Sequence, residues 1–206
     1  MKLSPVLFYC LLLLPGCKVY TFTIVDKKTP TRPYSKIMAI YLDEACDFTL
    51  FDSTTYNICL KSCFQRADNL ELRGTVEQLL AAKIGTRGTV VVSSADMLDS
   101  VTNSYTDFTK AITEGSYDAL LLVSFRKINH KIYFNGDASH RGSGEVYQKL
   151  VPGFQCFLFN AKNSNFPVWT AQLEIGNKTY SAHKGLTGGM ANEIAKSLKT
   201  IGYIAH

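Results

Sequence analysis

Residues 118–125, DALLLVSF, form a continuous apolar run between turn residues. Such a run is typical of a central strand that is covered on both faces of a sheet. The run continues as 126–134, RKINHKIYF, and then reaches Asn135-Gly136, which is the strongest short hairpin signal. Residues 144–151, GEVYQKLV, supply the return arm. We therefore expect a central strand that leads into a hairpin.

Four further strands surround this one in the predicted order. A second hairpin is predicted from two segments that flank a polar turn. The first, GFQCFLFNA at 153–161, is largely apolar, and in the second, PVWTAQLEI at 167–175, apolar and polar residues alternate. Compact apolar runs at 36–42 and 89–94 predict the other two strands. Both of these precede the central strand in the chain.

Three helices are expected between and after the strands. Asp68 and Glu71 form a capping box before a segment with apolar residues at helical spacing, and Gly85 suits its end. Residues 99–115 and 188–202 show the same spacing, and each ends in glycine. The order is β-α-β-α-β-β-β-β-α. This predicts an α/β fold, with a mixed β-sheet of about five to six strands and three helices packed on it.

The N-terminus predicts export from the cytoplasm. Lys2 precedes an apolar core of about nine residues, 6–14, which is too short for a bilayer span of roughly 20 residues. Residues 1–16 therefore read as a secretory signal peptide. We expect residues 17–34 to be a lipidated N-terminus and linker, with a short strand near its start, and residues 35–206 to form a single α/β domain.

The stretch Leu14-Pro15-Gly16-Cys17 resembles the lipobox of bacterial lipoproteins. Leu14, Gly16 and Cys17 match that motif, whereas Pro15 departs from it. The resemblance implies cleavage between Gly16 and Cys17 and lipid attachment to Cys17. The alternatives are ordinary signal cleavage, which leaves Cys17 as a thiol or a disulfide half, and an uncleaved buried strand.

The remaining cysteines bear on disulfide formation, and the overall charge bears on the class of binding partner. Four cysteines, Cys46, Cys59, Cys63 and Cys156, can form disulfides in an exported chain, and four allow three pairings. Pairing of Cys46 with Cys59 or Cys63 is favoured, against free buried thiols. The net charge is +5, but basic residues are scattered, so no nucleic-acid partner is expected.

Patterns for catalysis, metals and cofactors are absent from the sequence. It contains no GxSxG, HExxH or Walker A motif, and His130, His140, His183 and His206 are isolated. We therefore expect no enzyme, no metal and no cofactor. GLTGG at 185–189 precedes the expected last helix, where its amides could hold an anion, although a flexible helix entry is the commoner case.

Basic residues gather near the first predicted hairpin. Arg126, Lys127, His130 and Lys131 precede its turn, and His140 and Arg141 lie within it. Such a group can contact an anionic partner, such as lipid head groups or a glycan. A solvated hairpin tip is the commoner case.

A wider resemblance to bacterial lipoprotein domains rests on three sequence segments: SYDALLLVSF, FLFNAKNSNFPVWTAQLEI and ANEIAKSLKTIGYI. Together with the element order and the N-terminus, they resemble curli-secretion-type lipoproteins, the N-terminal domain of the Tol translocation protein, and related uncharacterised lipoprotein domains. The resemblance implies an envelope-tethered, non-enzymatic binding or assembly module that is sometimes oligomeric.

The expected function follows from the anchor and this resemblance. We expect a lipoprotein held at the membrane by its N-terminal lipid, with its domain in the periplasm or outside and a protein partner in the envelope. Lys18 is not the Asp that signals inner-membrane retention in enteric bacteria, so the outer membrane is expected. The alternatives are an oligomeric subunit of a secretion or transport assembly and a hydrolase with an unrecognised site.

Overall fold

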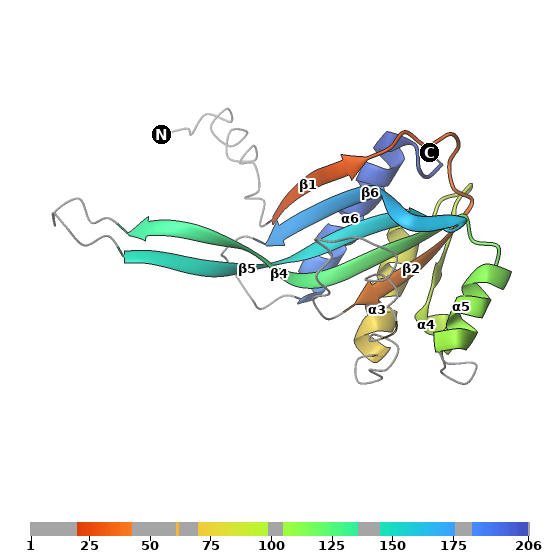
Figure 1. Ribbon diagram of the computed structural model, residues 1–206, viewed down its shortest axis with the longest axis horizontal. Helices are drawn as coiled ribbons and strands as arrows, with labels where there is room; N and C mark the ends of the chain where they lie inside the picture. Colours follow the sequence, from red (N-terminus) through yellow and green to blue (C-terminus); the bar gives the residue numbers. More distant parts are fainter. Residues whose placement is uncertain are drawn as a thin grey trace, which may run out of the picture.

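The computed structural model describes residues 20–42, 61, 70–98, 105–135, 145–175 and 183–205. They form a six-stranded mixed sheet with helices packed on it (Figure 1), which confirms the predicted α/β class. The strands are β1 (Tyr20–Lys27), β2 (Lys36–Leu42), β3 (Val90–Ser93), β4 (Ala119–Asn135), β5 (Glu145–Asn160) and β6 (Asn163–Ile175). The helices are α3 (Leu70–Ile84), the short α4 (Ala95–Leu98), α5 (Tyr105–Glu114) and α6 (His183–Ile201).

β4 lies inside the sheet, whose strand order is β1-β6-β5-β4-β2-β3. It pairs in parallel with β2, from Ile37 opposite Ala119 to Leu42 opposite Ser124, and antiparallel with β5. Residues 119–123 are at most 3% exposed. The predicted central strand is therefore confirmed. Because successive side chains of a strand point to opposite faces, both faces of β4 need a cover.

Two apolar clusters, one on each face of the sheet, result from this alternation. Leu121 of β4 belongs to the larger cluster, together with Leu80 of α3 and Ile194 of α6. Leu122 belongs to the second cluster, against which Ile112 of α5 packs. Hence α3 and α6 cover one face of the sheet, and α5 lies on the other.

β4 and β5 continue beyond the other strands as a two-stranded extension (Figure 1). β2 pairs with β4 only as far as Ser124, and β6 pairs with β5 only from Gly153 onward. The ladder between β4 and β5 nonetheless reaches Asn135, opposite Glu145. We call this extension the ribbon and define it as residues 126–135 and 145–152. Among the described strands, the ribbon pairs only with itself.

β5 is one strand, although the sequence predicted two strands at 144–151 and 153–161. Pro152 lies between these two predicted strands, and proline has no backbone N–H to donate. In the structure Pro152 lies opposite Lys127, at the point where β5 leaves β6. A strand tolerates proline where it has no neighbour on one side, so the strand passes through this position.

β1 extends the sheet into the segment that was expected to be a linker. It pairs antiparallel with β6, from Tyr20 opposite Ile175 to Lys27 opposite Trp169. The sheet therefore includes residues well before position 35. The Tyr203 hydroxyl secures the end of β1, since it donates to the Val168 carbonyl at 2.6 Å and accepts from the Lys28 amide at 3.2 Å.

α3 matches its predicted range within two residues. α5, Tyr105–Glu114, lies within the predicted 99–115, of which 99–104 lie outside the described residues. α6 begins at His183, so the segment 185–189 lies inside the helix. The expectation that this segment precedes the helix, as a flexible entry or as an anion-binding loop, is wrong. Gly202 has φ +92° and ends α6, as predicted.

Candidate functional site

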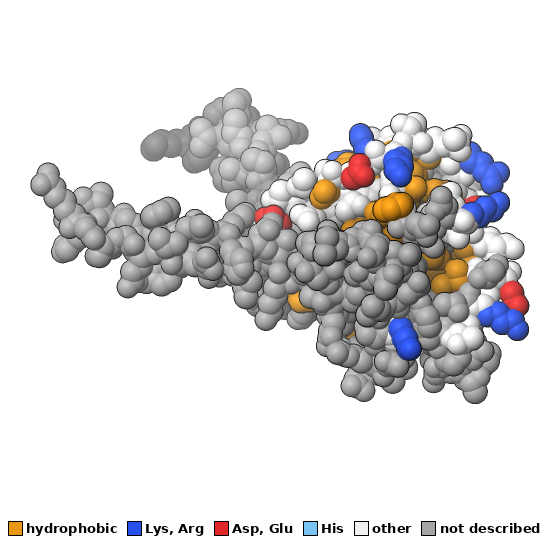
Figure 2. Space-filling model, viewed as in Figure 1, with side chains coloured by type: hydrophobic (Ala, Val, Ile, Leu, Met, Phe, Trp, Pro, Cys, Tyr) orange, Lys and Arg blue, Asp and Glu red, His pale blue; other side chains and the backbone are white. Residues whose placement is uncertain are grey.

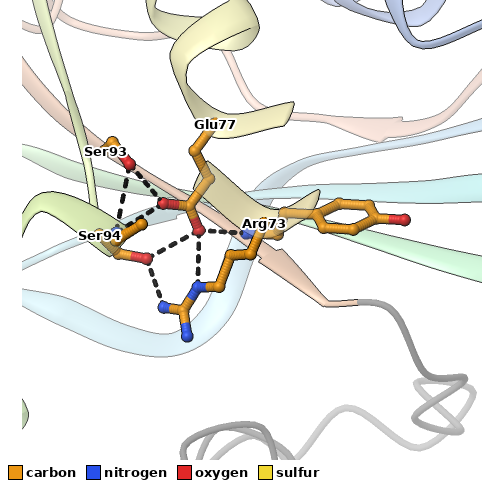
Figure 3. A network of polar contacts seen from close by, with 6 residues as sticks. Arg73, Glu77, Ser93 and Ser94 are labelled. Carbon is orange, nitrogen blue, oxygen red and sulfur yellow. Dashed lines mark hydrogen bonds and ion pairs between the residues drawn. The ribbon is translucent and has the colours of Figure 1, made fainter. Parts of the chain in front are cut away.

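A buried polar network lies where the carboxyl ends of β2 and β3 meet α3 (Figure 3). Arg73 and Glu77 project from neighbouring turns of α3, Ser93 is the last residue of β3, and Ser94 follows it. In open sheets with parallel strands, ligands bind outside the carboxyl ends of the strands. This network is therefore the first place to look for chemistry.

The Glu77 carboxylate accepts five hydrogen bonds. Its Oε1 accepts from the Tyr41 amide at 2.8 Å, the Ser94 hydroxyl at 2.8 Å and Arg73 Nε at 3.0 Å. Its Oε2 accepts from the Ser93 hydroxyl at 2.7 Å and the Ala95 amide at 2.8 Å. A carboxylate offers about four lone-pair positions, so Glu77 is saturated with donors.

The arrangement acts as a clamp between elements. Glu77 and Ser94 are fully buried, and Arg73 is 6% exposed. Arg73 also donates to the Ser94 hydroxyl, which keeps the guanidinium beside the carboxylate. The clamp joins α3 to the backbone of β2 and to the turn after β3. With its acceptor positions filled, Glu77 has none left for the proton of a substrate.

The sequence contained a signal for this pair that periodicity alone did not identify. The buried stripe of α3 consists of positions 73, 76, 77, 80 and 84. Leu72, which was assigned to the apolar face, is 39% exposed. An Arg and a Glu four residues apart on that stripe have to be paired, because a charge is seldom buried without a partner.

We predict that Glu77→Gln lowers the free energy of unfolding by about 3–5 kcal/mol. The substitution leaves the buried Arg73 guanidinium without its counter-charge, and it turns an NH₂ group toward donors. Urea denaturation of both proteins measures the difference. Glu71→Gln on the exposed side of the same helix is the matched control and should change stability by no more than about 0.5 kcal/mol. A loss below about 1 kcal/mol for Glu77→Gln would contradict the clamp.

A second polar group lies at the opposite, amino-terminal ends of β2 and β4. Asp118 Oδ2 accepts from the Ser35 hydroxyl at 2.6 Å, the Ser35 amide at 2.8 Å and the Lys36 amide at 3.2 Å. Arg32 lies 3.9 Å from Oδ1, but its side chain is largely exposed. Lys36 Nζ donates to the Gly115 carbonyl at 2.8 Å. These contacts fix the start of the parallel ladder.

Hydrogen bonds from Ser35 hold the pKa of Asp118 below its ordinary value of 3.8, with further lowering from the Lys36 amide and from Arg32, while partial burial opposes the shift. A carboxyl group whose pKa is lower in the folded state stabilises the fold above its unfolded pKa. That contribution is lost as the pH falls through the folded pKa. Asp118 is therefore a source of acid sensitivity.

We predict that Asp118→Asn lowers the free energy of unfolding at pH 7 by about 1.5–3 kcal/mol, because hydrogen bonds to a charged acceptor are lost. The variant should also lose less stability than the parent between pH 5 and pH 3. Denaturant titrations at several pH values test both statements. Asp96→Asn, an exposed site on α4, serves as the control, and an unchanged acid slope for Asp118→Asn would refute the assignment.

Of the site residues predicted from the sequence, only Cys156 lies within the described structure. Gly16 and Cys17, the expected cleavage and lipidation positions, lie outside the described residues, as do Cys46, Cys59 and Cys63 and hence their favoured pairing. Cys156 is a free cysteine that is fully buried in the larger apolar cluster. Burial raises the pKa of its thiol, which leaves it protonated and unreactive.

The histidines are also dispersed. His130 lies in the ribbon and His183 begins α6, whereas His140 and His206 lie outside the described residues. Across the described ranges, none of the helices is long and apolar enough to cross a membrane.

No model of a known protein family matches the chain, and no curated protein matches it. Among solved structures, the chain is similar to a variant PelC dodecamer from Paraburkholderia phytofirmans, with 12% identity, 89% of this chain and 98% of that chain covered, and a TM-score of 0.46. A DUF4136 family protein from Bacteroides thetaiotaomicron shows 10% identity, coverage of 91% and 98%, and a TM-score of 0.41.

Lipoprotein GNA1162 from Neisseria meningitidis shows 16% identity, coverage of 81% of this chain and 99% of that chain, and a TM-score of 0.31. With identities this low and TM-scores below 0.5, these likenesses neither place the chain in a family nor transfer a function to it. The resemblance to curli-secretion-type lipoproteins and to the Tol domain stays a prediction.

Proposed function

We propose that the protein is a bacterial lipoprotein, anchored through Cys17 and acting as a non-catalytic binding or assembly module of the envelope. The observation that carries this proposal is the stretch Leu14-Pro15-Gly16-Cys17 behind a short apolar core. The sheet starts directly after it, because β1 begins at Tyr20. A protein partner in the envelope, still to be identified, would bind the domain.

The distance between the anchor and the domain is short. From Cys17 to Tyr20 the chain advances three residues, which span at most about 11 Å when fully extended. Each buried CH₂ of an acyl chain contributes about 0.8 kcal/mol, so several chains hold a protein stably where a single chain does not. The domain would thus rest close to the membrane surface, with β1 next to it.

The non-catalytic assignment is supported by the state of the buried titratable groups. Glu77 is saturated by five donors. The Cys156 thiol is buried among apolar side chains. A hydrolase needs a nucleophile or base within reach of a substrate, and neither of these two groups offers one.

The outer membrane is the proposed location. Lys18 follows the modified cysteine where inner-membrane lipoproteins of enteric bacteria carry the Asp retention signal. The domain would then face the periplasm or the outside, where a disulfide among the cysteines before α3 is chemically permitted.

The mass of the mature protein tests the anchor. We predict that the wild-type chain begins at Cys17 and carries additional acyl mass, whereas Cys17→Ser carries none and keeps its signal peptide. Cys10→Ser is the matched control, because Cys10 leaves with the signal peptide and its loss should change nothing. A wild-type protein that is soluble and has no added mass would contradict the proposed lipid anchor. The same spectrum before and after reduction counts the disulfides.

A second candidate is an oligomeric subunit of an envelope assembly. It is favoured by exposed valines at the two edges of the sheet, Val25 in β1 at 57% exposure and Val90 in β3 at 59%. Unpaired edges are templates for another chain. We predict that, in this case, the detergent-solubilised protein is larger than a monomer and that Val90→Lys reduces its size. A monomer at all concentrations speaks for the single binding module.

A further inference from the structure

The ribbon projects from the end of the sheet at which β1 begins (Figure 1). The register shows this directly, because Glu174 of β6 lies opposite both Gly153 of β5 and Thr21 of β1. Gly153 is the residue next to the ribbon, and Thr21 is the second residue of β1. The base of the ribbon and the N-terminal attachment of the domain are therefore one strand apart at the same end.

The lengths allow the ribbon to contact the membrane that holds the anchor. The longer arm of the ribbon, 126–135, extends about 30 Å at about 3.3 Å per residue. The chain between Cys17 and β1 spans at most about 11 Å. A domain tethered this closely keeps its ribbon within reach of the surface that holds the anchor.

The ladder of the ribbon places like residues opposite one another. Lys131 lies opposite Lys149, and Tyr133 lies opposite Tyr147. Residues two apart along a strand share a face, so both pairs occupy one face of the ribbon. Like charges directly opposite each other destabilise a ladder. A partner that supplies negative charge would offset this repulsion.

We propose that the ribbon binds the anionic surface of the membrane to which the N-terminus is attached. Lipid phosphates would offset the repulsion between Lys131 and Lys149, and Tyr is a residue type that is enriched at the level of the headgroups. The inference rests on the proposed anchoring for the choice of membrane. The charge of the ribbon, however, acts with or without the anchor.

The composition favours lipid over the other occupants. The ribbon contains four Arg and Lys residues, at 126, 127, 131 and 149, against one acidic residue, Glu145. On the described part of the face in Figure 2, Lys and Arg are spread around the surface rather than gathered. Unpaired strand edges are costly in hydrocarbon, which keeps the ribbon in the headgroup layer.

The test is amide hydrogen exchange of the ribbon in the mature protein, reconstituted in phosphatidylcholine vesicles with or without phosphatidylglycerol. We predict slower exchange only with phosphatidylglycerol, and loss of this protection at high salt, where surface charges are screened. A lysine near an anionic surface contributes about fivefold to binding. Lys131→Gln with Lys149→Gln should therefore weaken the protection about 25-fold.

The controls separate binding from folding and from anchoring. Lys162→Gln with Lys196→Gln changes two exposed lysines outside the ribbon and should keep full protection. Without phosphatidylglycerol, the ribbon variant should exchange no faster than the parent, because the substitution removes a repulsion. If the mature protein has no acyl mass, it is added to preformed vesicles, and slower exchange with phosphatidylglycerol is still expected.

Two results would overturn the inference. Equal exchange with and without phosphatidylglycerol, or an unaffected ribbon variant, would show that the lysine pair is merely solvated. Protection that grows with protein concentration on phosphatidylcholine alone would mean that a second copy pairs with the edges of the ribbon. A failed acyl-mass measurement, by contrast, leaves these outcomes readable and bears only on the anchor.

Discussion

The parallel ladder between β2 and β4 is the constraint on which the rest of the fold depends. It joins two strands between which the chain passes through α3, β3, α4 and α5, and a parallel pair requires such a crossover connection. It buries Ile37, Leu121 and their neighbours on both faces. The same strand, β4, then leaves the sheet after Ser124 and becomes one arm of the ribbon.

Two carboxylates hold the ends of this ladder. Glu77 accepts a hydrogen bond from the Tyr41 amide near the carboxyl end of β2, and Asp118 accepts hydrogen bonds from Ser35 and Lys36 at the amino end. Glu77 accepts hydrogen bonds from the protein's own backbone, from two hydroxyls and from Arg73, and Asp118 Oδ2 accepts from Ser35 and from the Lys36 amide. Both carboxylates therefore tie the ends of the ladder to neighbouring parts of the domain.

Much of the fold could be predicted because its signals are local. The apolar run at 118–125, the capping box before α3 and Gly202 after α6 each act through neighbouring residues. The failures involve longer-range effects. The strand continues through Pro152 because no described strand neighbours β5 on its β6 side at that position. The glycines at 185–189 lie inside α6, although glycine has a low intrinsic helix propensity.

The polar clusters were harder to predict than the strands. Nothing near Glu77 in the sequence shows that Ser93, Ser94 and Tyr41 will surround it, because these residues meet only after the sheet forms. For the cysteines, the sequence suggested an interaction in which one of them does not take part. Four in an exported chain suggested pairing, yet the position of Cys156 on the α6-covered face of β5 makes it part of the apolar core.

The pairing of β1 with β6 has a consequence for how the chain folds. Tyr20 and Ile175 are 155 residues apart, so this ladder closes one of the longest loops in the protein. Contacts between such distant residues form slowly, and β6 leaves the ribosome long after β1. In a chain held at Cys17, the first strand waits at the membrane for the last one. The sheet would then be completed at the bilayer, where the tether confines the search to a small volume.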